Sequence, residues 1–205
     1  MSETSAFYGP GHRALQETFR SRDLADRLEA VSVVDALDDA AQAFIAARDF
    51  FFLSSVDTGG FPTVSYKGGD AGFVKVVSPT ELLVPMYDGN GMFYSTGNIA
   101  DDPKIGLLFI NFEAPHRVRV KATAELTREP DVLALWPEVG LAARIHVVQA
   151  WINCPRYIHP MKKLEAAAHV PRENVQTPAA EWKSYPGIED VVPPPPHEIK
   201  DNSTS

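Results

Sequence analysis

The sequence predicts a mainly β fold, a closed or split β-barrel with flanking helices. Two observations support this fold class. After residue 50 the apolar residues leave helical spacing and form short runs rich in β-branched and aromatic residues, separated by turns of a few residues. Only one short helix interrupts the first runs, whereas parallel strands would need a long crossover between every pair. We therefore expect antiparallel strands that curl into a barrel, and not a Rossmann sheet.

Helices are expected before the first strand. Residues 13–33 place apolar side chains at mostly helical spacing among charged neighbours, which predicts one or two surface helices. A clearer helix follows in DDAAQAFIAARD, where Asp38 or Asp39 can cap the N-terminus. Its apolar stripe consists of Ala41, Phe44, Ile45 and Ala47.

About seven strands follow, with expected ranges 50–56, 61–66, 73–77, 82–86, 105–112, 117–126 and 142–153. A helical stretch is expected near residues 130–139, between the last two strands. The strand at 117–126 alternates strictly between apolar and polar residues. Its apolar face consists of Val118, Val120, Ala122, Ala124 and Leu126. This strand is therefore expected to be half buried.

The stretch from Tyr87 to Phe109 interrupts the strands with a Gly-rich loop and one short helix. Residues 88–91, Asp-Gly-Asn-Gly, tolerate positive φ, so several backbone N–H groups can turn toward one point. The helix that follows adds the positive end of its dipole, and Asp101-Asp102-Pro103 ends it. Such a loop suits a phosphate, but an ordinary connector explains the same residues, and both interpretations stay open on the loop alone.

Composition excludes several classes of protein. With 205 residues, 44% of them hydrophobic, the chain is long enough for one sizeable core. The net charge of -8 argues against non-specific nucleic-acid binding, which relies on clustered cations. Cys154 is the only cysteine and cannot form an internal disulfide. Neither a signal peptide nor a membrane span is recognisable, so a cytoplasmic protein with no membrane partner is expected.

No motif in the sequence indicates hydrolytic or metal chemistry. The sequence lacks a nucleophile elbow, an H-E-x-x-H pair, a P-loop and a dinucleotide fingerprint, and its six histidines are scattered, so no metal is expected. Positive charge is better organised. Lys67 lies at a strand end, and Arg117, Arg119 and Lys121 share one strand face, with alternate residues about 6.6 Å apart. These cations suit an anionic ligand, although a solvated strand face has the same pattern.

Four segments together resemble the flavin-binding split-barrel family related to pyridoxamine 5'-phosphate oxidase. They are VSYKGGDAGFVKV, LVPMYDGNGMF, STGNIADDPKIGLLFINFEAPHRVRVKATAEL and NCPRYIH, and they occur in the family's order. The N-terminal FYGPGHRALQ and LADRL resemble one bacterial branch of that family, whose substrate is unassigned. The resemblance implies a six-stranded antiparallel split β-barrel, a homodimer, and one FMN in each of two symmetric clefts between the subunits.

The resemblance also implies individual site residues. Ser65, Tyr66 and Lys67 match the strand whose backbone and basic side chain lie along the flavin and its phosphate. Met86 and Tyr87 match the end of the next strand, beside the isoalloxazine ring.

Further matches lie in the loop, in its helix and on a later strand. Gly89, Asn90, Gly91 and Met92 fall where the family's loop and helix N-terminus approach the phosphate, and Asn98 lies on that helix. Arg117 and Arg119 correspond to a strand that contributes polar contacts, in the family often from the neighbouring subunit. The segment Asn153-Cys154-Pro155-Arg156-Tyr157 matches a C-terminal motif of the branch without a defined role.

One departure concerns the phosphate. The oxidase proper has Ser-Arg-Lys in the phosphate loop, where this sequence reads Gly-Asn-Gly-Met without a cation. Lys67, Arg117 or Arg119 and backbone N–H groups would then have to meet the phosphate charge. The oxidase's C-terminal substrate signature is not recognisable in AEWKSYPGIED, so oxidation of pyridoxamine phosphate is not expected.

The resulting hypothesis is an FMN-binding flavoprotein, an FMN-dependent oxidoreductase acting on a small molecule that the sequence does not identify. The alternative is a non-catalytic flavin- or anion-binding dimer with a storage, sensing or structural role. The broader superfamily also implies deazaflavin and haem as ligands. Three regions are expected: an N-terminal helical segment packed on the barrel at 1–49, the FMN-binding split barrel at 50–185, and a Pro-rich tail at 186–205. The tail composition favours extended, disordered chain or packing over a partner subunit.

Overall fold

The computed structural model describes residues 7–199 of the chain. Its contacts divide it into two units, Met1–Val34 and Asp35–Ser205. The first unit contains α1 (Pro10–Thr18) and α2 (Arg22–Ser32), the two surface helices that the spacing predicts, and neither has a buried residue. Within this unit, Arg13 on α1 forms an ion pair with Asp26 on α2 at 2.5 Å. The N-terminal region expected at 1–49 extends into the second unit, which contains helix α3 (Asp39–Ala46). Residues 1–6 lie outside the described part.

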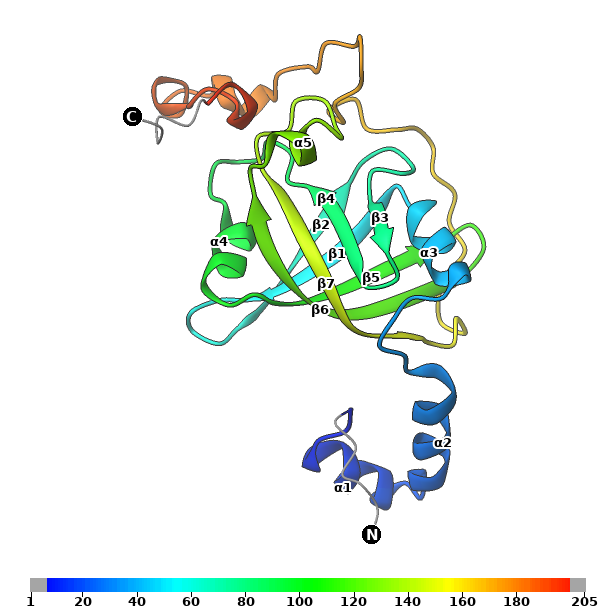
Figure 1. The fold of residues 1–205 in the computed structure, drawn as a ribbon. Coiled ribbons are helices and arrows are strands. Elements are labelled where there is room, and N and C mark those ends of the chain that lie inside the picture. The colour runs from blue at the N-terminus through cyan, green and yellow to red at the C-terminus, as the bar shows by residue number, and fades with distance from the viewer. Residues whose placement is uncertain (1–6, 200–205) are drawn as a thin grey trace. The chain divides into compact units, whose positions relative to one another are not determined.

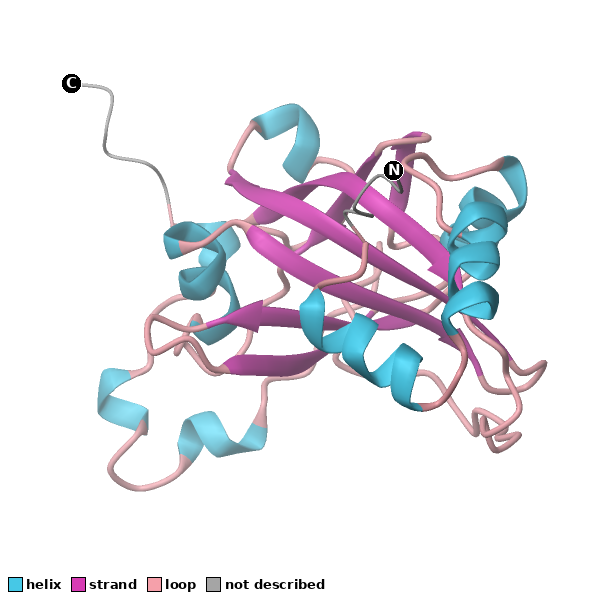
Figure 2. Cartoon of the chain, turned by 90° about the horizontal axis from the view of Figure 1, so that it is seen from below, coloured by secondary structure: helices cyan, strands magenta, loops and turns pink. Residues whose placement is uncertain are grey.

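The second unit is built around one antiparallel sheet of seven strands. Its strands follow the order β2-β1-β5-β6-β7-β4-β3, and every neighbouring pair is antiparallel. The bounds are β1 Phe50–Val56, β2 Pro62–Gly68, β3 Lys75–Ser78, β4 Glu81–Pro85, β5 Lys104–Asn111, β6 His116–Thr127 and β7 Ala142–Ile152. The sheet curls on itself (Figures 1 and 2), which confirms the antiparallel split barrel, with one strand more than the six that the resemblance implies.

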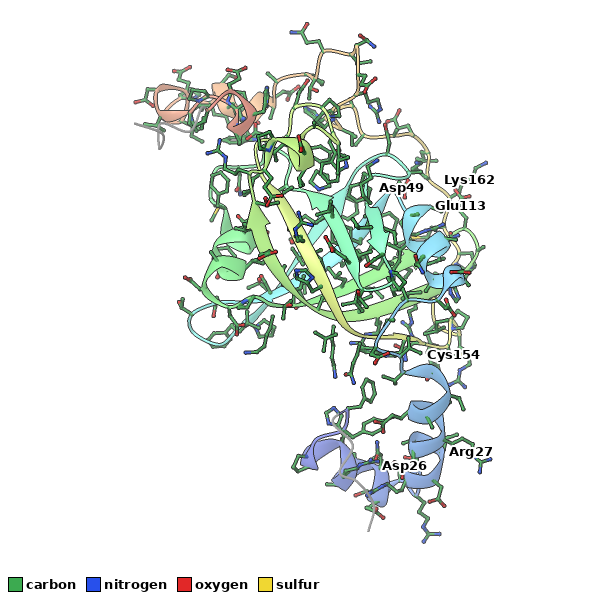
Figure 3. All side chains as sticks on the ribbon, viewed as in Figure 1. Asp26, Arg27, Asp49, Glu113, Cys154 and Lys162 are labelled. Atoms are coloured by element: carbon green, nitrogen blue, oxygen red, sulfur yellow. The ribbon has the colours of Figure 1, made fainter. Side chains whose placement is uncertain are left out.

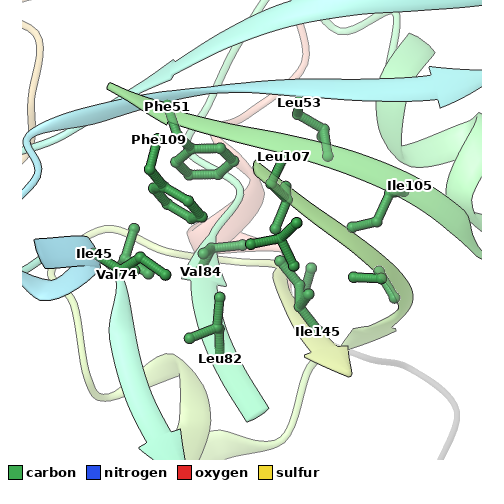
Figure 4. Close-up of a cluster of buried hydrophobic side chains, with 14 of the residues drawn as sticks. Ile45, Phe51, Leu53, Val74, Leu82, Val84, Ile105, Leu107, Phe109 and Ile145 are labelled. Carbon is green, nitrogen blue, oxygen red and sulfur yellow. The ribbon is translucent and has the colours of Figure 1, made fainter. Parts of the chain in front are cut away.

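Strand alternation places the core inside the curl of the sheet. On β6, Val118, Val120, Ala122 and Ala124 are buried while the residues between them remain more exposed, as the sequence predicts. Side chains from β1, β4, β5 and β7 meet them (Figure 4), among them Phe51, Leu53, Val84, Phe109 and Ile145. Helix α3 (Asp39–Ala46) closes one end by burying Ile45 against this core. Asp38 is its N-cap, because its carboxylate accepts the Ala41 N–H at 2.7 Å.

Two predicted elements are shorter than expected. The strand predicted at 73–77 starts at Lys75, because the Phe73 N–H donates to the Asp70 carbonyl at 2.9 Å in a turn. The helix predicted near 130–139 is α5 (Pro130–Leu133), a single turn. Trp136 lies beyond it and is drawn into the interior, where its indole N–H donates to the Phe73 carbonyl at 2.7 Å. A tertiary hydrogen bond therefore ends the local helical pattern.

The chain beyond β7 contains no strand up to residue 199 and crosses the surface of the second unit. Arg172 holds it with a bidentate pair to Asp70 at 2.6 and 2.7 Å. Three short 3-10 turns follow: η1 Glu181–Ser184, η2 Glu189–Val191 and η3 Pro196–Glu198. The described part of the tail predicted at 186–205 contains η2 and η3, and residues 200–205 lie outside it. Among the described residues, the helices are too short and too polar to span a bilayer.

Candidate functional site

A cavity of about 270 Å³ lies between β2, the end of β4 and helix α4 (Tyr94–Asp101). It gathers seven of the predicted cofactor residues: Ser65, Lys67, Met86, Tyr87, Gly89, Asn90 and Gly91. Thr63, Val64, Phe93, Tyr94, Ser95, Thr96 and Pro196 complete its lining. We call it the anion cavity, because its described lining includes the Lys67 ammonium and no carboxylate.

The main charge in the anion cavity is the ammonium group of Lys67. Alternation along β2 turns Thr63, Ser65 and Lys67 toward the cavity. The Lys67 Nζ donates to the Ser95 Oγ at 2.9 Å. Among the described residues it has no carboxylate partner, and its burial lowers the pKa of the ammonium below the ordinary lysine value. A partly desolvated cation with a neutral partner is a strong attractor for an anion.

The N-terminus of α4 adds backbone donors to the same cavity. The N-cap residue Phe93 has φ 49° and offers no side-chain cap. The N–H groups of Tyr94, Ser95 and Thr96, in the first turn, therefore lack an intrahelical acceptor. Gly91 precedes them with φ 74°, a value that glycine adopts without strain. These first-turn donors and the helix dipole favour negative charge in front of Ser95.

Asn98, also predicted to bind the cofactor, does not line the cavity. It lies on the buried face of α4, and its amide Nδ2 donates to the Ser55 Oγ at 3.1 Å and to the Thr63 Oγ1 at 3.4 Å. The Ser55 and Thr63 hydroxyls are also 3.1 Å apart. This network fixes α4 against β1 and β2, so it positions Ser95 opposite Lys67.

Replacing Asn98 with alanine should lower the free energy of unfolding by about 1–3 kcal/mol, because the buried Ser55 hydroxyl loses a partner. Urea denaturation followed by circular dichroism measures this difference. An unchanged denaturation midpoint would contradict the positioning role.

Tyr87 and Met86 form the wall opposite β2. Burial raises the pKa of the Tyr87 phenol to about 12, with a further contribution from Asp70, so this side chain is neutral at physiological pH. Met86 is buried, and its N–H donates to the Leu141 carbonyl at 2.9 Å. A neutral phenol and a thioether next to the cation make this wall suitable for a flat, weakly polar group.

Tyr66, in contrast, points to the other face of β2. Its ring stacks on Phe50 at 5.4 Å, and Phe50 stacks in turn on Phe112 at 5.8 Å. These rings line a separate groove of about 530 Å³ whose polar rim includes Asp49, Glu113 and Lys162 (Figure 3). Strand alternation alone separates Tyr66 from Ser65 and Lys67.

Arg117 and Arg119 also lie outside the anion cavity. They line a third cavity of about 430 Å³ on the outer face of the sheet, together with Lys121, Trp151 and Asn153. The Arg119 guanidinium lies 5.0 Å from the centre of the Trp151 ring, and the Arg117 Nη2 donates to the Cys154 carbonyl at 3.0 Å. Val64 borders both this basic cavity and the anion cavity. Within one chain, the predicted cations therefore occupy two neighbouring sites.

Met92 lies on the far side of the loop, 67% exposed, where it borders a crevice between the loop and the C-terminal segment. The sequence prediction missed Ser95 and Thr96, although hydroxyl residues at a helix start after a Gly-rich loop are a recognisable signal. It also missed Pro196, for which the sequence contains no local signal, since that residue is far along the chain.

A family profile described as Pyridoxamine 5'-phosphate oxidase matches residues 37–163, more than half of the chain. The match spans every strand of the sheet and both walls of the anion cavity. No curated protein sequence matches the chain.

Among the solved structures with a similar fold are three whose descriptions name different ligands or activities. A candidate pyridoxamine 5'-phosphate oxidase from Lactobacillus delbrueckii is 21% identical, with a TM-score of 0.47, over 58% of this chain and 95% of that chain. An FMN-binding protein from Syntrophomonas wolfei is 11% identical, with a TM-score of 0.45, over 68% and 97%. The haem storage protein HutZ from Vibrio cholerae is 18% identical, with a TM-score of 0.40, over 55% and 89%. The last two descriptions name different ligands, so these likenesses do not select one.

Proposed function

We propose, because this chain belongs to the pyridoxamine 5'-phosphate oxidase family, that it binds FMN in the anion cavity and acts as an FMN-dependent oxidoreductase on a small molecule. One observation carries the proposal: a partly desolvated lysine, which has no carboxylate partner within residues 7–199, faces the uncapped N-terminus of a helix. This arrangement fits a phosphate dianion even though the loop has no cation of its own.

The proposed roles follow from where the side chains lie. Lys67 and the first-turn N–H groups of α4 would hold the phosphate, with the Ser95 hydroxyl between them as an additional donor. Met86 and Tyr87 would border the ring system, which needs a flat and weakly polar wall. When bound, FMN supplies hydride-accepting chemistry, so no side chain of the chain has to act as a nucleophile. The chain supplies position, charge and exclusion of water.

We also propose that the site is completed by a second copy of the chain. Within one chain, Arg117 and Arg119 lie in a different cavity from Lys67. In the proposed homodimer, the basic cavity of one copy would face the anion cavity of the other copy. The apolar outer face near β2 supports this, since Val64 is 70% exposed and Tyr66 is 62% exposed on an edge strand. In that arrangement either arginine would favour a negatively charged reduced flavin.

The decisive measurement is a titration of the purified chain with FMN, followed by visible absorption and flavin fluorescence. We expect saturable binding at on the order of one flavin per chain, with an absorption band at about 450 nm. Failure to bind FMN would overturn the proposal, and saturation with haem or a deazaflavin instead would assign the cavity to that ligand.

A second measurement separates catalysis from binding alone. The FMN complex is mixed with NADH or NADPH without oxygen, and bleaching of the flavin band is followed. Bleaching at a rate that saturates with the donor supports the oxidoreductase. Stable binding without reduction by these or other electron donors would favour the non-catalytic flavin-binding dimer.

A further inference from the structure

The C-terminal segment at residues 181–199 folds back onto the loop of the anion cavity. Lys183 forms an ion pair with Asp88 at the start of that loop. Trp182 and the apolar residues that follow face the other side of the same loop and enclose with it a crevice of about 410 Å³. The apolar lining from the segment consists of Trp182, Ile188, Val191, Val192 and Pro193. The loop is thus held between the cavity on one side and the segment on the other.

A second attachment lies at the end of the segment. The Arg128 guanidinium donates to the Gly140 carbonyl at 3.2 Å and to the Ile199 carbonyl at 2.7 Å, so one side chain joins the barrel to the segment. In Figure 1 this orange to red segment lies beside the part of the second unit that carries α5.

Gly140 shows how closely the segment is seated. A β-carbon added at this buried glycine would lie 2.3 Å from the carbonyl carbon and oxygen of Pro196 and 2.6 Å from the His197 nitrogen. These are backbone atoms and cannot rotate away. Only glycine therefore permits this contact, and the contact brings Pro196 to its position in the lining of the anion cavity.

From these contacts we propose that residues 181–199 form a strap that closes the anion cavity within the same chain and slows the exchange of its ligand. The ligand is FMN if the proposed function holds; the closure itself does not depend on that identity. The Pro193–Pro195 run that leads into η3 suits this role, because consecutive prolines favour an extended chain that loses little conformational entropy when it docks.

The test compares three proteins with the full-length chain: Gly140→Ala, a truncation after Tyr185, and Gly11→Ala as the matched control. Gly11 has open space where a β-carbon would be, and it lies in the first unit. The first readout is the rate at which a small amine-reactive reagent acylates Lys67, measured by mass spectrometry relative to Lys104 in the same molecules. Lys104 is 80% exposed and serves as an internal reference. The second readout is the dissociation rate of FMN, from the recovery of flavin fluorescence.

We expect Gly140→Ala and the truncation to raise the Lys67 to Lys104 labelling ratio several-fold and to speed FMN release by about tenfold, since changes at a binding surface act mostly on dissociation. Gly11→Ala should change neither. An unchanged labelling ratio in both strap variants would overturn the closure, and unchanged FMN release with faster labelling would overturn ligand retention. If the full-length chain binds no FMN, the proposed function fails, while the labelling ratio still decides whether the strap closes the cavity.

Discussion

Replacing Lys67 with alanine is expected to weaken FMN binding by about tenfold to 150-fold, the equivalent of the roughly 1.5–3 kcal/mol that a hydrogen bond to a charged group contributes. The physical reason is that the Lys67 ammonium is the one cation among the described lining residues of the anion cavity. Fluorescence titration at fixed ionic strength measures the dissociation constant. The difference in FMN affinity between the wild type and Lys67→Ala should be smaller at high salt, because salt screens part of the attraction between Lys67 and the phosphate.

The matched control is Lys104→Ala, which removes an exposed lysine at the start of β5 that forms an ion pair with the neighbouring Asp102. It changes the net charge of the chain by the same amount but should leave FMN affinity unchanged. Equal losses in the two variants would mean that general charge, and not a contact at Lys67, attracts the ligand. Unchanged affinity in Lys67→Ala would show that the phosphate lies elsewhere.

The same lysine predicts a pH dependence. Burial lowers the Lys67 pKa, so the ammonium loses its proton at a lower pH than an exposed lysine, and FMN affinity should fall as pH rises through that lowered pKa. The phosphate stays doubly charged above about pH 7 and does not contribute. Lys67→Arg keeps the charge and should abolish the fall. The free energy of unfolding of the ligand-free chain should change with pH in the opposite direction. Because the Lys67 pKa is lower in the folded state than in the unfolded state, Lys67 makes the chain more stable as pH rises from the folded-state pKa to the unfolded-state pKa.

Much of the fold can be predicted from the sequence because its strands are defined by local pattern. The alternation at 117–126 reappears on β6, where Val118 and Val120 are buried and the arginines beside them face the other way. The same local reasoning overextends the helix near 130–139, because the pattern does not show that Trp136 finds its partner at the Phe73 carbonyl. Helix length there is set by a contact between residues far apart in the chain.

The site is less predictable for the same reason. Loop chemistry and the resemblance to the family predict a phosphate site at Lys67, Gly89 and Gly91, and these residues do line one cavity. Strand alternation already turns Tyr66 away from Lys67, toward the groove that it lines with Phe50 and Phe112. Which cavity Arg117 lines depends instead on how the sheet curls, because it lies on the outer face. The contribution of Pro196 depends on a backbone contact with Gly140, which no periodicity reveals.

A second large effect is expected for Trp136→Ala, which should lower the free energy of unfolding by about 3–5 kcal/mol. Trp136 is 7% exposed and centres a small hydrophobic cluster with Leu83, Val132, Val139 and Ala142. Since a domain's whole stability is about 5–15 kcal/mol, the variant should unfold at a much lower urea concentration. Circular dichroism against urea measures the shift.

Trp136→Phe separates the contribution of packing to the free energy of unfolding from the contribution of the indole hydrogen bond. The phenyl ring retains most of the apolar contact, but the buried Phe73 carbonyl loses the indole N–H that it accepts at 2.7 Å, which should cost about 1–3 kcal/mol. Tyr87 packs against the cluster that contains Trp136 and also lines the anion cavity, so this cluster supports one wall of the cavity. FMN affinity of the folded Trp136→Phe chain should change far less than in Lys67→Ala, because no ligand contact is removed. If Trp136→Phe unfolds at the wild-type urea concentration, the hydrogen bond does not stabilise the corner, and packing of the ring alone explains the alanine variant.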